Sequence, residues 1–299
     1  MRNTPVCFYN ASIKECSRRH SGEIQSRLNR RNRVIFMADY LITGACGGMG
    51  TALCRRLAEE GHRVWGLDRT PPKEQEPWTY VPADITSRED LLAAFEQVSA
   101  EAGALDGIIH MAGRYDLNSL VEMPEEDFLL DFDVNLFGMF RVNRRFISLL
   151  REKGRIVIVS SELAPLYPLP FTGIYAVTKT AVEKYAAALR MELQLLGHRV
   201  SVVRPGAVRT DMLPASTEKL DRFCDETRLY TCNAERFRKI VNKVEARNIL
   251  PEKVACLVSR ILKAPKPRRL YCINRNPLLL LLNALPRRTQ LWVIRRILS

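Results

Sequence analysis

The amino-acid sequence lacks several features that mark specialised classes of protein. No apolar stretch reaches the roughly 18 residues that a membrane-spanning helix requires, and the longest candidate, PLLLLLNAL at 277–285, contains Asn283. Histidine occurs only four times in 299 residues, never with the spacing of a zinc site. The eight cysteines include no C-x-x-C pair, and no secretory hydrophobic segment lies near the start. These absences predict a chain without a bound metal, with free thiols in a reducing compartment such as the cytoplasm.

Acidic residues are missing from the C-terminal part of the chain. Residues 253–299 hold eleven Lys and Arg and no Asp or Glu, and residues 1–36 hold eight Lys and Arg against two Glu. Because the whole chain has a net charge of +13, the residues between these two ends carry a small negative charge. A nucleic-acid-binding domain carries its basic face on the fold itself, so we expect no nucleic-acid partner.

Residues 1–36 form a polar, arginine-rich leader without apolar periodicity. Three interpretations stay open for it: a disordered or mis-assigned extension, a mitochondrial-type presequence, which is rich in arginine and poor in acids, and a functional basic arm. In all three, we expect the fold to begin at Met37 and to extend over 37–275, followed by a separate tail at 276–299.

After Met37, short apolar runs alternate with segments of helical periodicity. Continuous apolar runs predict strands of a sheet that is covered on both faces, and they lie at 40–45, 63–68, 78–84, 107–113, 155–161, 199–206 and 269–273. Strands that alternate with helices predict βαβ units. We therefore expect an α/β fold, with a Rossmann-type doubly wound parallel sheet of about seven strands and helices on both faces.

Two helix boundaries can also be predicted. After the first strand, Met49, Leu53 and Leu57 recur at four-residue steps, and Gly61 is placed where a helix would end. After the third strand, TSRE at 86–89 is a capping-box pattern that begins another helix.

The stretch LITGACGGMG at 41–50 places four glycines within seven positions, directly between a predicted strand and a predicted helix. Gly44 would allow a sharp turn, while Gly48 and Gly50 would let the backbone approach a pyrophosphate and let the helix pack on the strand. A glycine cluster alone is also typical of an ordinary tight loop. The strand before it, the helix after it and the acid at Asp68 favour a dinucleotide site.

Two acids at strand ends could contact the cofactor. A carboxylate at Asp68 can accept both ribose hydroxyls and would repel a 2′-phosphate, which favours NAD(H). NADP(H) stays open because the neighbouring Arg69 could attract that phosphate, and Asp68 could equally be a surface residue paired with Arg69. Asp84 could accept a hydrogen bond from the adenine amine, or could be a turn residue or a helix cap.

Six motifs in order resemble the short-chain dehydrogenase/reductase family over about residues 38–275. They are TGACGGMG (43–50), HMAG (110–113), DVNLFG (133–138), VSS (159–161), YAVTK (175–179) and RPGAVRT (204–210). His110 departs from the family, which usually has Asn there. The resemblance implies a homodimer or homotetramer and a small-molecule substrate. It also implies the cofactor-binding residues, which we expect to be Gly44, Cys46, Gly48, Met49, Gly50, Asp68, Asp84, Ile85, Ala112, Gly113, Tyr175, Lys179, Pro205, Gly206, Val208 and Thr210.

The catalytic residues expected from the chemistry and the resemblance are Asn135, Ser161, Tyr175 and Lys179. Alcohol oxidation needs a base while nicotinamide accepts the hydride. Tyr175 and Lys179 are four apart on a helix, so the ammonium can favour the phenolate. A chance Y-x-x-x-K with a solvated lysine has the same spacing.

The serine and the asparagine leave alternatives open. Ser160 and Ser161 end the same strand and face opposite ways, and the family spacing favours Ser161 as the residue that polarises the substrate oxygen. A buried Asn135 amide needs partners, either on a neighbouring strand or, as the resemblance implies, through a water beside Lys179.

The substrate is indicated only by general character. We expect residues 207–250 to form a lid, because they follow the sixth strand directly. In the tail, Leu291, Val293, Ile294 and Ile297 can share one side of a short helix beside Arg295 and Arg296. Such a segment can pack within the protein, cap a lipophilic channel, contact another subunit or lie on a membrane surface.

These features favour a secondary or primary alcohol, or its ketone or aldehyde, on a hydrophobic steroid-, retinoid- or lipid-like substrate. The alternatives are a reductase of a sugar or acyl-carrier substrate, and a non-catalytic dinucleotide-binding regulatory protein. We expect a cytoplasmic enzyme, with peripheral membrane contact through the tail and a mitochondrial location as further alternatives.

Overall fold

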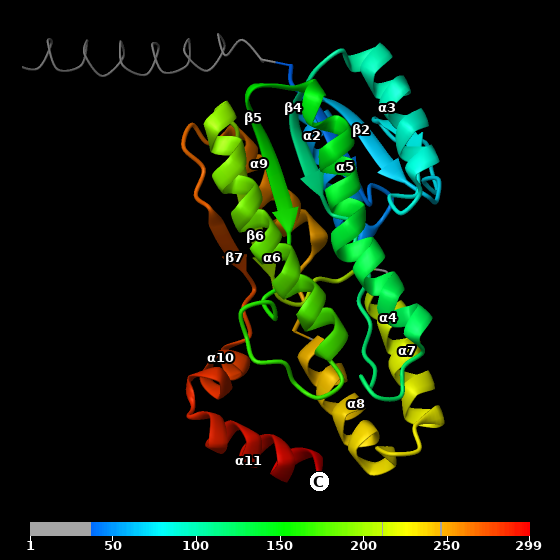
Figure 1. Ribbon diagram of the computed structural model, residues 1–299, viewed down its shortest axis with the longest axis vertical. Helices are drawn as coiled ribbons and strands as arrows, with labels where there is room; N and C mark the ends of the chain where they lie inside the picture. Colours follow the sequence, from blue (N-terminus) through cyan, green and yellow to red (C-terminus); the bar gives the residue numbers. More distant parts are fainter. Residues whose placement is uncertain (1–36, 211, 246) are drawn as a thin grey trace, which may run out of the picture. The chain divides into compact units, whose positions relative to one another are not determined.

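The computed structural model describes residues 37–210, 212–245 and 247–299 (Figure 1). The three interpretations of the leader, residues 1–36, therefore lie outside the described residues. In the described part of the chain, seven strands form one fully parallel sheet in the order β3-β2-β1-β4-β5-β6-β7. The strands are β1 (Asp39–Thr43), β2 (Arg63–Asp68), β3 (Thr79–Pro82), β4 (Leu105–His110), β5 (Leu150–Val159), β6 (Arg199–Pro205) and β7 (Leu270–Ile273). This confirms the predicted doubly wound α/β sheet.

Helices cover both faces of the sheet. On one face lie α3 (Arg88–Ala102), α5 (Met139–Phe146) and α6 (Gly173–Leu193), and on the other lie α2 (Gly48–Glu59) and α9 (Pro251–Lys263). In β1, Leu41 belongs to the first core, while Tyr40 and Ile42 belong to the second. Both faces of the central strands are therefore buried, which explains why their sequences are continuous apolar runs.

The strand order reverses between β1 and β4. The chain moves outward from β1 through β2 to β3, then returns to place β4 on the other side of β1. Ligands of such sheets bind outside the carboxyl ends of the strands at this point. Five of the seven strands end one to three residues earlier than predicted, among them β4 at His110 and β5 at Val159. Residues 111–113 and 160–161 are therefore loop residues at the sheet edge instead of strand residues.

Of the two predicted helix boundaries, one is confirmed and the other is shifted by one residue. Gly61 has a φ of +84° just after α2, and the amide of His62 donates to the carbonyl of Leu57 at 3.0 Å, as expected at a helix end. The capping box of α3 is shifted by one residue from the predicted TSRE. Ser87 is the N-cap and accepts from the Asp90 amide, because Thr86 is instead engaged with the Asp84 side chain.

Helices beyond the carboxyl ends of the strands complete the fold (Figure 1). α4 (Glu125–Phe132) continues into a one-turn π-helical segment, η1 (Asp133–Gly138). At the opposite edge of the sheet, the single 3₁₀ turns η2 (Ile147–Leu149) and η3 (Gln194–Leu196) lead into β5 and β6. The predicted lid segment, 207–250, contains α7 (Met212–Glu226) and α8 (Thr231–Glu245). The tail forms α10 (Pro277–Ala284) and α11 (Arg287–Leu298).

A third apolar core joins the lid to the tail. It contains Leu220 and Phe223 of α7, Phe237 of α8 and Leu298 of α11. No helix among the described residues is long and apolar enough to cross a membrane.

Candidate active site

Two neighbouring hollows lie at the carboxyl ends of the strands. The first has about 1150 Å³ of empty space, opens to solvent and is lined mostly by apolar groups. The second lies beside it along the ends of β1, β2 and β4. Both are lined by Met111, Gly113, Arg114 and Tyr115. The two hollows therefore form one groove across the point where the strand order reverses, and we call them the substrate hollow and the nucleotide hollow.

The glycine loop has close contacts that no other residue would permit. Gly44 has a φ of +69°, and a Cβ on it would lie 2.6 Å from the amide nitrogen of Ala112. A Cβ on Gly50 would lie 2.0 Å from the Gly44 carbonyl oxygen, so α2 can pack on the loop only without a side chain there. A Cβ on Gly48 would lie 2.9 Å from the Thr210 side chain. The loop is therefore a cradle bounded by the loops that follow β4 and β6.

The helix after the cradle begins in a way that suits an anion. α2 starts at Gly48, and its N-cap residue Gly47 provides no side-chain hydrogen bond to the first amides. The first turn of α2 contains no acidic residue. Free amides and the helix dipole at such an end favour phosphate. The cradle and the helix end together fit the pyrophosphate of a dinucleotide.

The predicted cofactor residues lie on three sides of this cradle. The nucleotide hollow is lined by Gly44, Asp68, Asp84, Ile85, Ala112 and Gly113. The substrate hollow is lined by Met49, Gly113, Tyr175, Lys179, Pro205, Gly206, Val208 and Thr210. Cys46 and Gly48 line neither of the two and instead border a hollow on the far side of the loop. Burial raises the pKa of the Cys46 thiol to about 12, so this group stays protonated.

The two acids predicted to contact the cofactor are held by hydrogen bonds to neighbouring backbone and side chains. The Asp68 carboxylate accepts from the amides of Cys46 at 3.0 Å and Thr70 at 3.1 Å, so it is fixed at the end of β2. One oxygen of Asp84 accepts from both the amide and the hydroxyl of Thr86, at 2.8 and 2.7 Å. Asp84 thus makes the turn that was one of its alternatives while it also lines the nucleotide hollow.

Tyr175 and Lys179 lie one turn apart near the start of α6. The Lys179 ammonium is 5.7 Å from the centre of the Tyr175 ring and donates to the Val159 carbonyl at 3.3 Å. Burial lowers the pKa of Lys179 to about 8 and raises the pKa of Tyr175 to about 12. The predicted lowering of the tyrosine pKa by the lysine is therefore not the dominant effect here. Removing the phenol from water outweighs the opposing hydrogen bond of Ser161 and holds the phenol protonated.

The two serines after β5 have different partners. Ser161 lines the substrate hollow and is hydrogen-bonded to Tyr175, and its oxygen also accepts from the Leu163 amide at 3.1 Å. The Ser160 hydroxyl donates to Glu183 at 2.9 Å, and Glu183 in turn pairs with Arg204. Ser160 therefore belongs to an ion-pair cluster between α6 and β6, and Ser161 is the serine beside Tyr175.

Asn135 lies in the π-helical turn η1 and binds the loop after β4. Its carbonyl oxygen accepts from the Arg114 amide at 2.8 Å, and its amino group donates to the Arg114 carbonyl at 3.0 Å and the Thr178 hydroxyl at 3.1 Å. A Cβ on Gly113 would lie 3.2 Å from the Asn135 oxygen and 3.3 Å from the Lys179 nitrogen. The asparagine thus clamps the loop that separates the two hollows.

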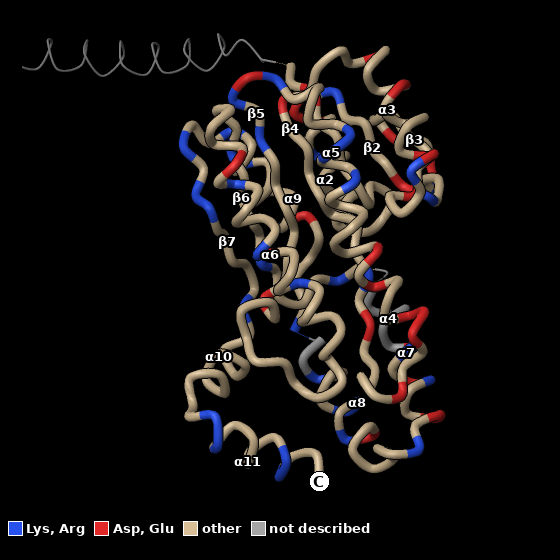
Figure 2. Tube along the Cα trace, viewed as in Figure 1, with Lys and Arg blue, Asp and Glu red and all other residues tan. Residues whose placement is uncertain are grey.

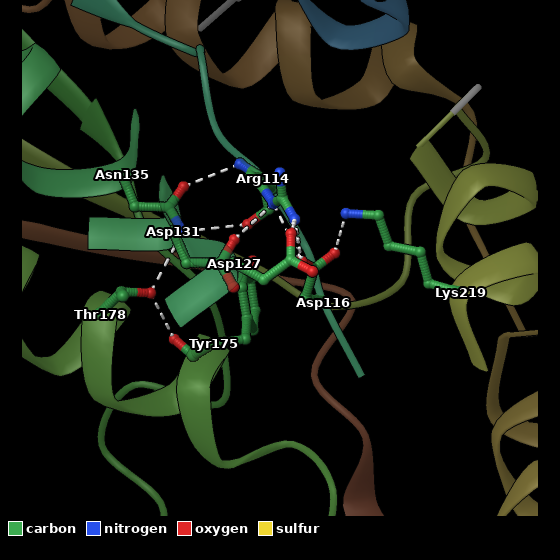
Figure 3. A network of polar contacts seen from close by, with 8 residues as sticks. All are labelled: Arg114, Asp116, Asp127, Asp131, Asn135, Tyr175, Thr178 and Lys219. Carbon is green, nitrogen blue, oxygen red and sulfur yellow. Dashed lines mark hydrogen bonds and ion pairs between the residues drawn. The ribbon is translucent and has the colours of Figure 1, made fainter. Parts of the chain in front are cut away.

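An ion-pair cluster around Arg114 extends from this clamp to the lid (Figure 3). The Arg114 guanidinium lies 2.6 Å from Asp116, 2.5 Å from Asp127 and 2.8 Å from Asp131. Asp116 also pairs with Lys219 of α7, which lines the nucleotide hollow. Burial raises the pKa of Asp131 to about 7. The sequence reasoning missed Arg114; its place directly after the HMAG motif was the available signal.

Two further residues at the site were also missed. The rings of Tyr115 and Tyr175 meet edge to face at 4.6 Å between centroids, which fixes the orientation of the phenol. Glu162 is buried beside Ser161 and lines the substrate hollow. It accepts from the Asn276 amide at 2.7 Å, just before α10. No sequence spacing links Glu162 to Asn276.

His110 does not reach the groove. It is buried at the end of β4, and its Nε2 lies 2.8 Å from the side-chain oxygen of Asn143 in α5. Asn143 in turn donates to the hydroxyl of Tyr185 in α6. Burial lowers the pKa of His110 to about 4. In the described part of the chain, no group of three His, Cys, Asp or Glu side chains could hold a metal ion.

Comparison with known proteins agrees with this geometry. Residues 39–221 match the family described as short chain dehydrogenase. The chain belongs to the short-chain dehydrogenase/reductase family. Members of this family are oxidoreductases that bind NAD(P)(H), so enzymatic oxidation or reduction is the shared activity.

Relatives within the family differ in substrate. The chain is 28% identical over 229 residues to 3-ketodihydrosphingosine reductase of Bacteroides thetaiotaomicron, covering 76% of this chain and 84% of that protein. It is 33% identical over 185 residues to mouse 17-beta-hydroxysteroid dehydrogenase type 6, covering 58% of each. A variant of actinorhodin polyketide ketoreductase solved with NADPH has the same fold, with a TM-score of 0.66 and 25% identity. That match covers 80% of this chain and 97% of the ketoreductase.

Proposed function

We propose that this member of the family reduces a ketone or aldehyde on a hydrophobic, lipid-like substrate, and oxidises the corresponding alcohol in reverse. The observation that carries this proposal is the meeting of Tyr175, Ser161 and Lys179 in a mostly apolar hollow beside the glycine cradle. The first two side chains give a proton donor and a second polar group for one substrate oxygen. The cradle gives a place for a dinucleotide.

The cofactor would be held by residues already fixed in the fold. The amides of the glycine loop and the first turn of α2 would bind the pyrophosphate. Asp68, Asp84 and Ile85 would line the adenosine side, and Pro205, Gly206, Val208 and Thr210 the nicotinamide side. When bound, the nicotinamide supplies or accepts the hydride, which no side chain can do.

The protein supplies the proton and orients the substrate oxygen. The high pKa of Tyr175 keeps its phenol protonated at neutral pH, so it can donate a proton to a carbonyl oxygen. The Ser161 hydroxyl beside it would donate to the same oxygen as negative charge develops there. Lys179, which is mostly protonated near pH 7, would return a proton to Tyr175. This arrangement favours reduction at neutral pH.

The lining of the hollow supports an apolar substrate. Besides polar residues such as Arg114, Glu162 and Thr172, the lining contains apolar side chains from the loop after β5, from α8 and from α10, namely Leu163, Leu169, Phe237, Ile240, Val241 and Leu279. Such a surface suits an alkyl chain or a sterol ring system. Two relatives are named for a long-chain ketone and a steroid, in line with this class.

The cofactor preference proposed is NAD(H). The fixed Asp68 carboxylate at the end of β2 would accept from the ribose hydroxyls and repel a 2′-phosphate. NADP(H) remains the alternative because Arg69 lines the same hollow. We also propose a cytoplasmic homodimer or homotetramer in peripheral contact with a membrane.

Two other functions were predicted as alternatives. A sugar or acyl-carrier substrate would be favoured by a polar or basic hollow; Arg114 and Glu162 do line this one, but most of its lining is apolar. A purely regulatory dinucleotide-binding protein would need only the cradle, whereas Ser161, Tyr175 and Lys179 lie together beside it.

The test is turnover by the purified full chain. NADH or NADPH oxidation is followed with long-chain 3-ketones, keto-steroids, retinal, sugars and acyl thioesters. We expect the hydrophobic ketones to be reduced. Tyr175→Phe should lower kcat by at least roughly 100-fold, since general acid catalysis contributes about that much, while leaving nucleotide binding unchanged. Tyr167→Phe, at an exposed tyrosine, is the matched control. Full activity in Tyr175→Phe would overturn the proposal.

A further inference from the structure

The outer surfaces of α10 and α11 expose large apolar side chains to solvent. Trp292 is 67% exposed and Leu291 54% on α11, and Leu278 and Leu281 of α10 are 61% and 63% exposed. Arg288 and Arg295 lie three and four positions from these α11 residues, so they share their face. We call these six side chains the tail surface: Leu278, Leu281, Arg288, Leu291, Trp292 and Arg295.

The opposite side of the tail is firmly attached to the fold. Leu298 and Ile294 pack in the third apolar core beside α8. The side-chain amide of Asn233 in α8 donates to the Leu298 carbonyl at 2.7 Å. The prediction that these apolar residues of the tail share one side of a helix is therefore wrong. Ile294 faces α8, while Leu291 and Ile297 face solvent. The exposed side chains of the tail are therefore those that stay in solvent when its other side packs on the fold.

The charge of the tail decides which partner fits it. No acid follows Glu252 in the sequence, and Figure 2 shows basic but no acidic residues along α10 and α11. An amphipathic helix with arginines and a tryptophan beside exposed leucines suits the interface of an anionic bilayer. A two-fold dimer through the same face would bring arginines against arginines, which costs free energy. Charge complementarity therefore favours an anionic lipid surface over a second copy.

The tail surface adjoins the substrate hollow through α10. Leu279 lines that hollow, while its neighbour Leu278 is exposed on the outside. The start of α10 is also linked to the site, because the Asn276 amide donates to Glu162, the residue after Ser161. One short helix is thus a wall of the hollow on one side and part of the outer surface on the other.

We propose that the tail surface docks on an anionic lipid bilayer, and that a lipid-like substrate passes from the bilayer into the hollow beside Leu279 of α10. The docking part stands on the tail alone. The passage of substrate rests on the proposed function, because it requires an apolar substrate that partitions into the bilayer.

Docking is tested by flotation of the full chain with vesicles. We expect binding to phosphatidylcholine vesicles that contain phosphatidylserine and little binding to phosphatidylcholine alone. Arg288→Gln with Arg295→Gln should weaken binding by roughly tenfold or more, as expected for two basic residues near an anionic surface. Lys253→Gln with Arg260→Gln, exposed residues of α9, makes the same charge change and should have no effect. Equal weakening by both pairs would overturn docking through the tail.

The contribution of the apolar side chains to vesicle binding is tested by a separate variant. Trp292→Ser should also weaken vesicle binding, whereas Leu92→Ser, at an exposed residue of α3, should not. Absence of binding in the unmodified chain would overturn the docking proposal. So would a dimer that Trp292→Ser dissociates and that does not bind vesicles, because the surface would then be occupied by a second copy.

Passage of the substrate beside Leu279 is tested by enlarging that side chain. Leu279→Trp should slow reduction of a long-chain ketone in vesicles several-fold while leaving a short water-soluble ketone unaffected, and Leu278→Trp should change neither. Equal slowing of both ketones by Leu279→Trp would overturn the entry route. If no ketone is turned over, the proposed function fails and the entry route with it, whereas the vesicle result still decides docking.

Discussion

Tyr175 shows how strongly the surroundings of one residue control its chemistry. Burial raises its pKa to about 12, while burial lowers that of Lys179 to about 8. The pair is therefore set to give a proton to a substrate and to recover it, which is the requirement of carbonyl reduction.

The pKa of Lys179 leads to a prediction about pH dependence. As pH rises through about 8, Lys179 loses its proton and can no longer resupply Tyr175, so kcat for reduction should fall. Lys179→Arg keeps the positive charge at all these pH values. That variant should be slower overall but should lose the decline near pH 8. A decline that persists unchanged in the arginine variant would show that another group titrates.

Asp68 leads to a prediction about cofactor choice. Asp68→Asn removes the charge that would bind the ribose hydroxyls and repel a 2′-phosphate. We expect NADH to bind roughly tenfold more weakly, in line with the loss of a charged hydrogen bond, and NADPH to bind more tightly. Fluorescence titration measures both. Asp84→Asn is the control, and it should weaken both nucleotides by a similar small factor.

His110 leads to a prediction about stability. Its folded pKa of about 4 lies below the ordinary 6.5, so the unfolded chain binds the proton first. Its contribution to the free energy of unfolding is complete above pH 6.5 and is lost as pH falls to 4, by ~3 kcal/mol. Asp131, with a raised pKa, opposes this over an overlapping range. Urea unfolding of His110→Asn should therefore show a smaller loss between pH 6.5 and 4 than the unmodified chain.

At the scale of single residues, the sequence allowed prediction of those site residues whose partners lie close to them in the chain. Tyr175 and Lys179 could be placed because they are one helical turn apart. Arg114 could not, because its partners lie on two other elements, Asp127 and Asp131 on α4 and, through Asp116, Lys219 on α7. Glu162 was missed for the same reason, since its partner Asn276 lies 114 residues away.

At the scale of elements, the lid helix α7 is linked to the loop after β4. The Lys219 ammonium pairs with Asp116, which also binds Arg114, and Asn135 holds the backbone of Arg114 (Figure 3). Because Lys219 lines the nucleotide hollow, this ion pair holds α7 beside that hollow.

Breaking this ion pair should loosen the lid without removing a catalytic group. In Lys219→Met, we expect NADH to dissociate several-fold faster, since a partly exposed ion pair contributes about 1 kcal/mol. Amides of α7 should also exchange their hydrogens faster. Lys239→Met in α8 removes an exposed lysine of the same kind and should change neither rate. Unchanged dissociation in Lys219→Met would mean that α7 is held by its apolar core alone.

The sequence predicted the order of the elements better than their ends. Alternating apolar runs and amphipathic segments set the order of strands and helices. The ends depended on side-chain competition that periodicity does not record, as at α3. There Asp84 engages Thr86, and the cap moves to Ser87. The π-helical turn η1 was not predicted, because its residues have the same apolar pattern as an ordinary helix.

At the scale of the whole molecule, further apolar side chains are exposed on η1 and α5. Phe137 and Phe140 are 47% and 46% exposed. They border a hollow that is lined by α3 and α5 and shares no residue with the groove or the tail. They offer a surface for the expected homodimer or homotetramer that would leave the tail free.

We therefore predict that Phe137→Asp with Phe140→Asp yields a monomer, measured by sedimentation velocity. Burying like charges at the centre of an interface is unfavourable, so association should weaken by several orders of magnitude. Leu129→Asp with Val121→Asp, at exposed residues nearer the lid, is the comparison and should retain the oligomer. A double variant at 137 and 140 that keeps its size would place the interface elsewhere.

For the molecule as a whole, the sequence predicted the sheet but not the position of the tail. The sheet followed from local pattern, because each βαβ unit is continuous in the chain. The location of the tail did not, since nothing in PLLLLLNAL indicates that Leu279 faces the hollow while Leu278 faces out.

The π-helical turn at Asp133–Gly138 has a genetic consequence. Such a turn holds one residue more than an α-helix would, and each residue advances a helix by about 100°. Losing a single codon here would let the turn relax to regular α geometry, and because a π turn takes up its extra residue within itself, α4 and α5 would keep nearly the same orientation. Asp127 and Asp131 of α4 would then still face Arg114, whereas Asn135, which lies inside the turn, would be displaced from the Arg114 backbone. An in-frame loss of one codon beside Asn135 would thus release the backbone of the loop between the two hollows while leaving the ion pairs of Arg114 in place.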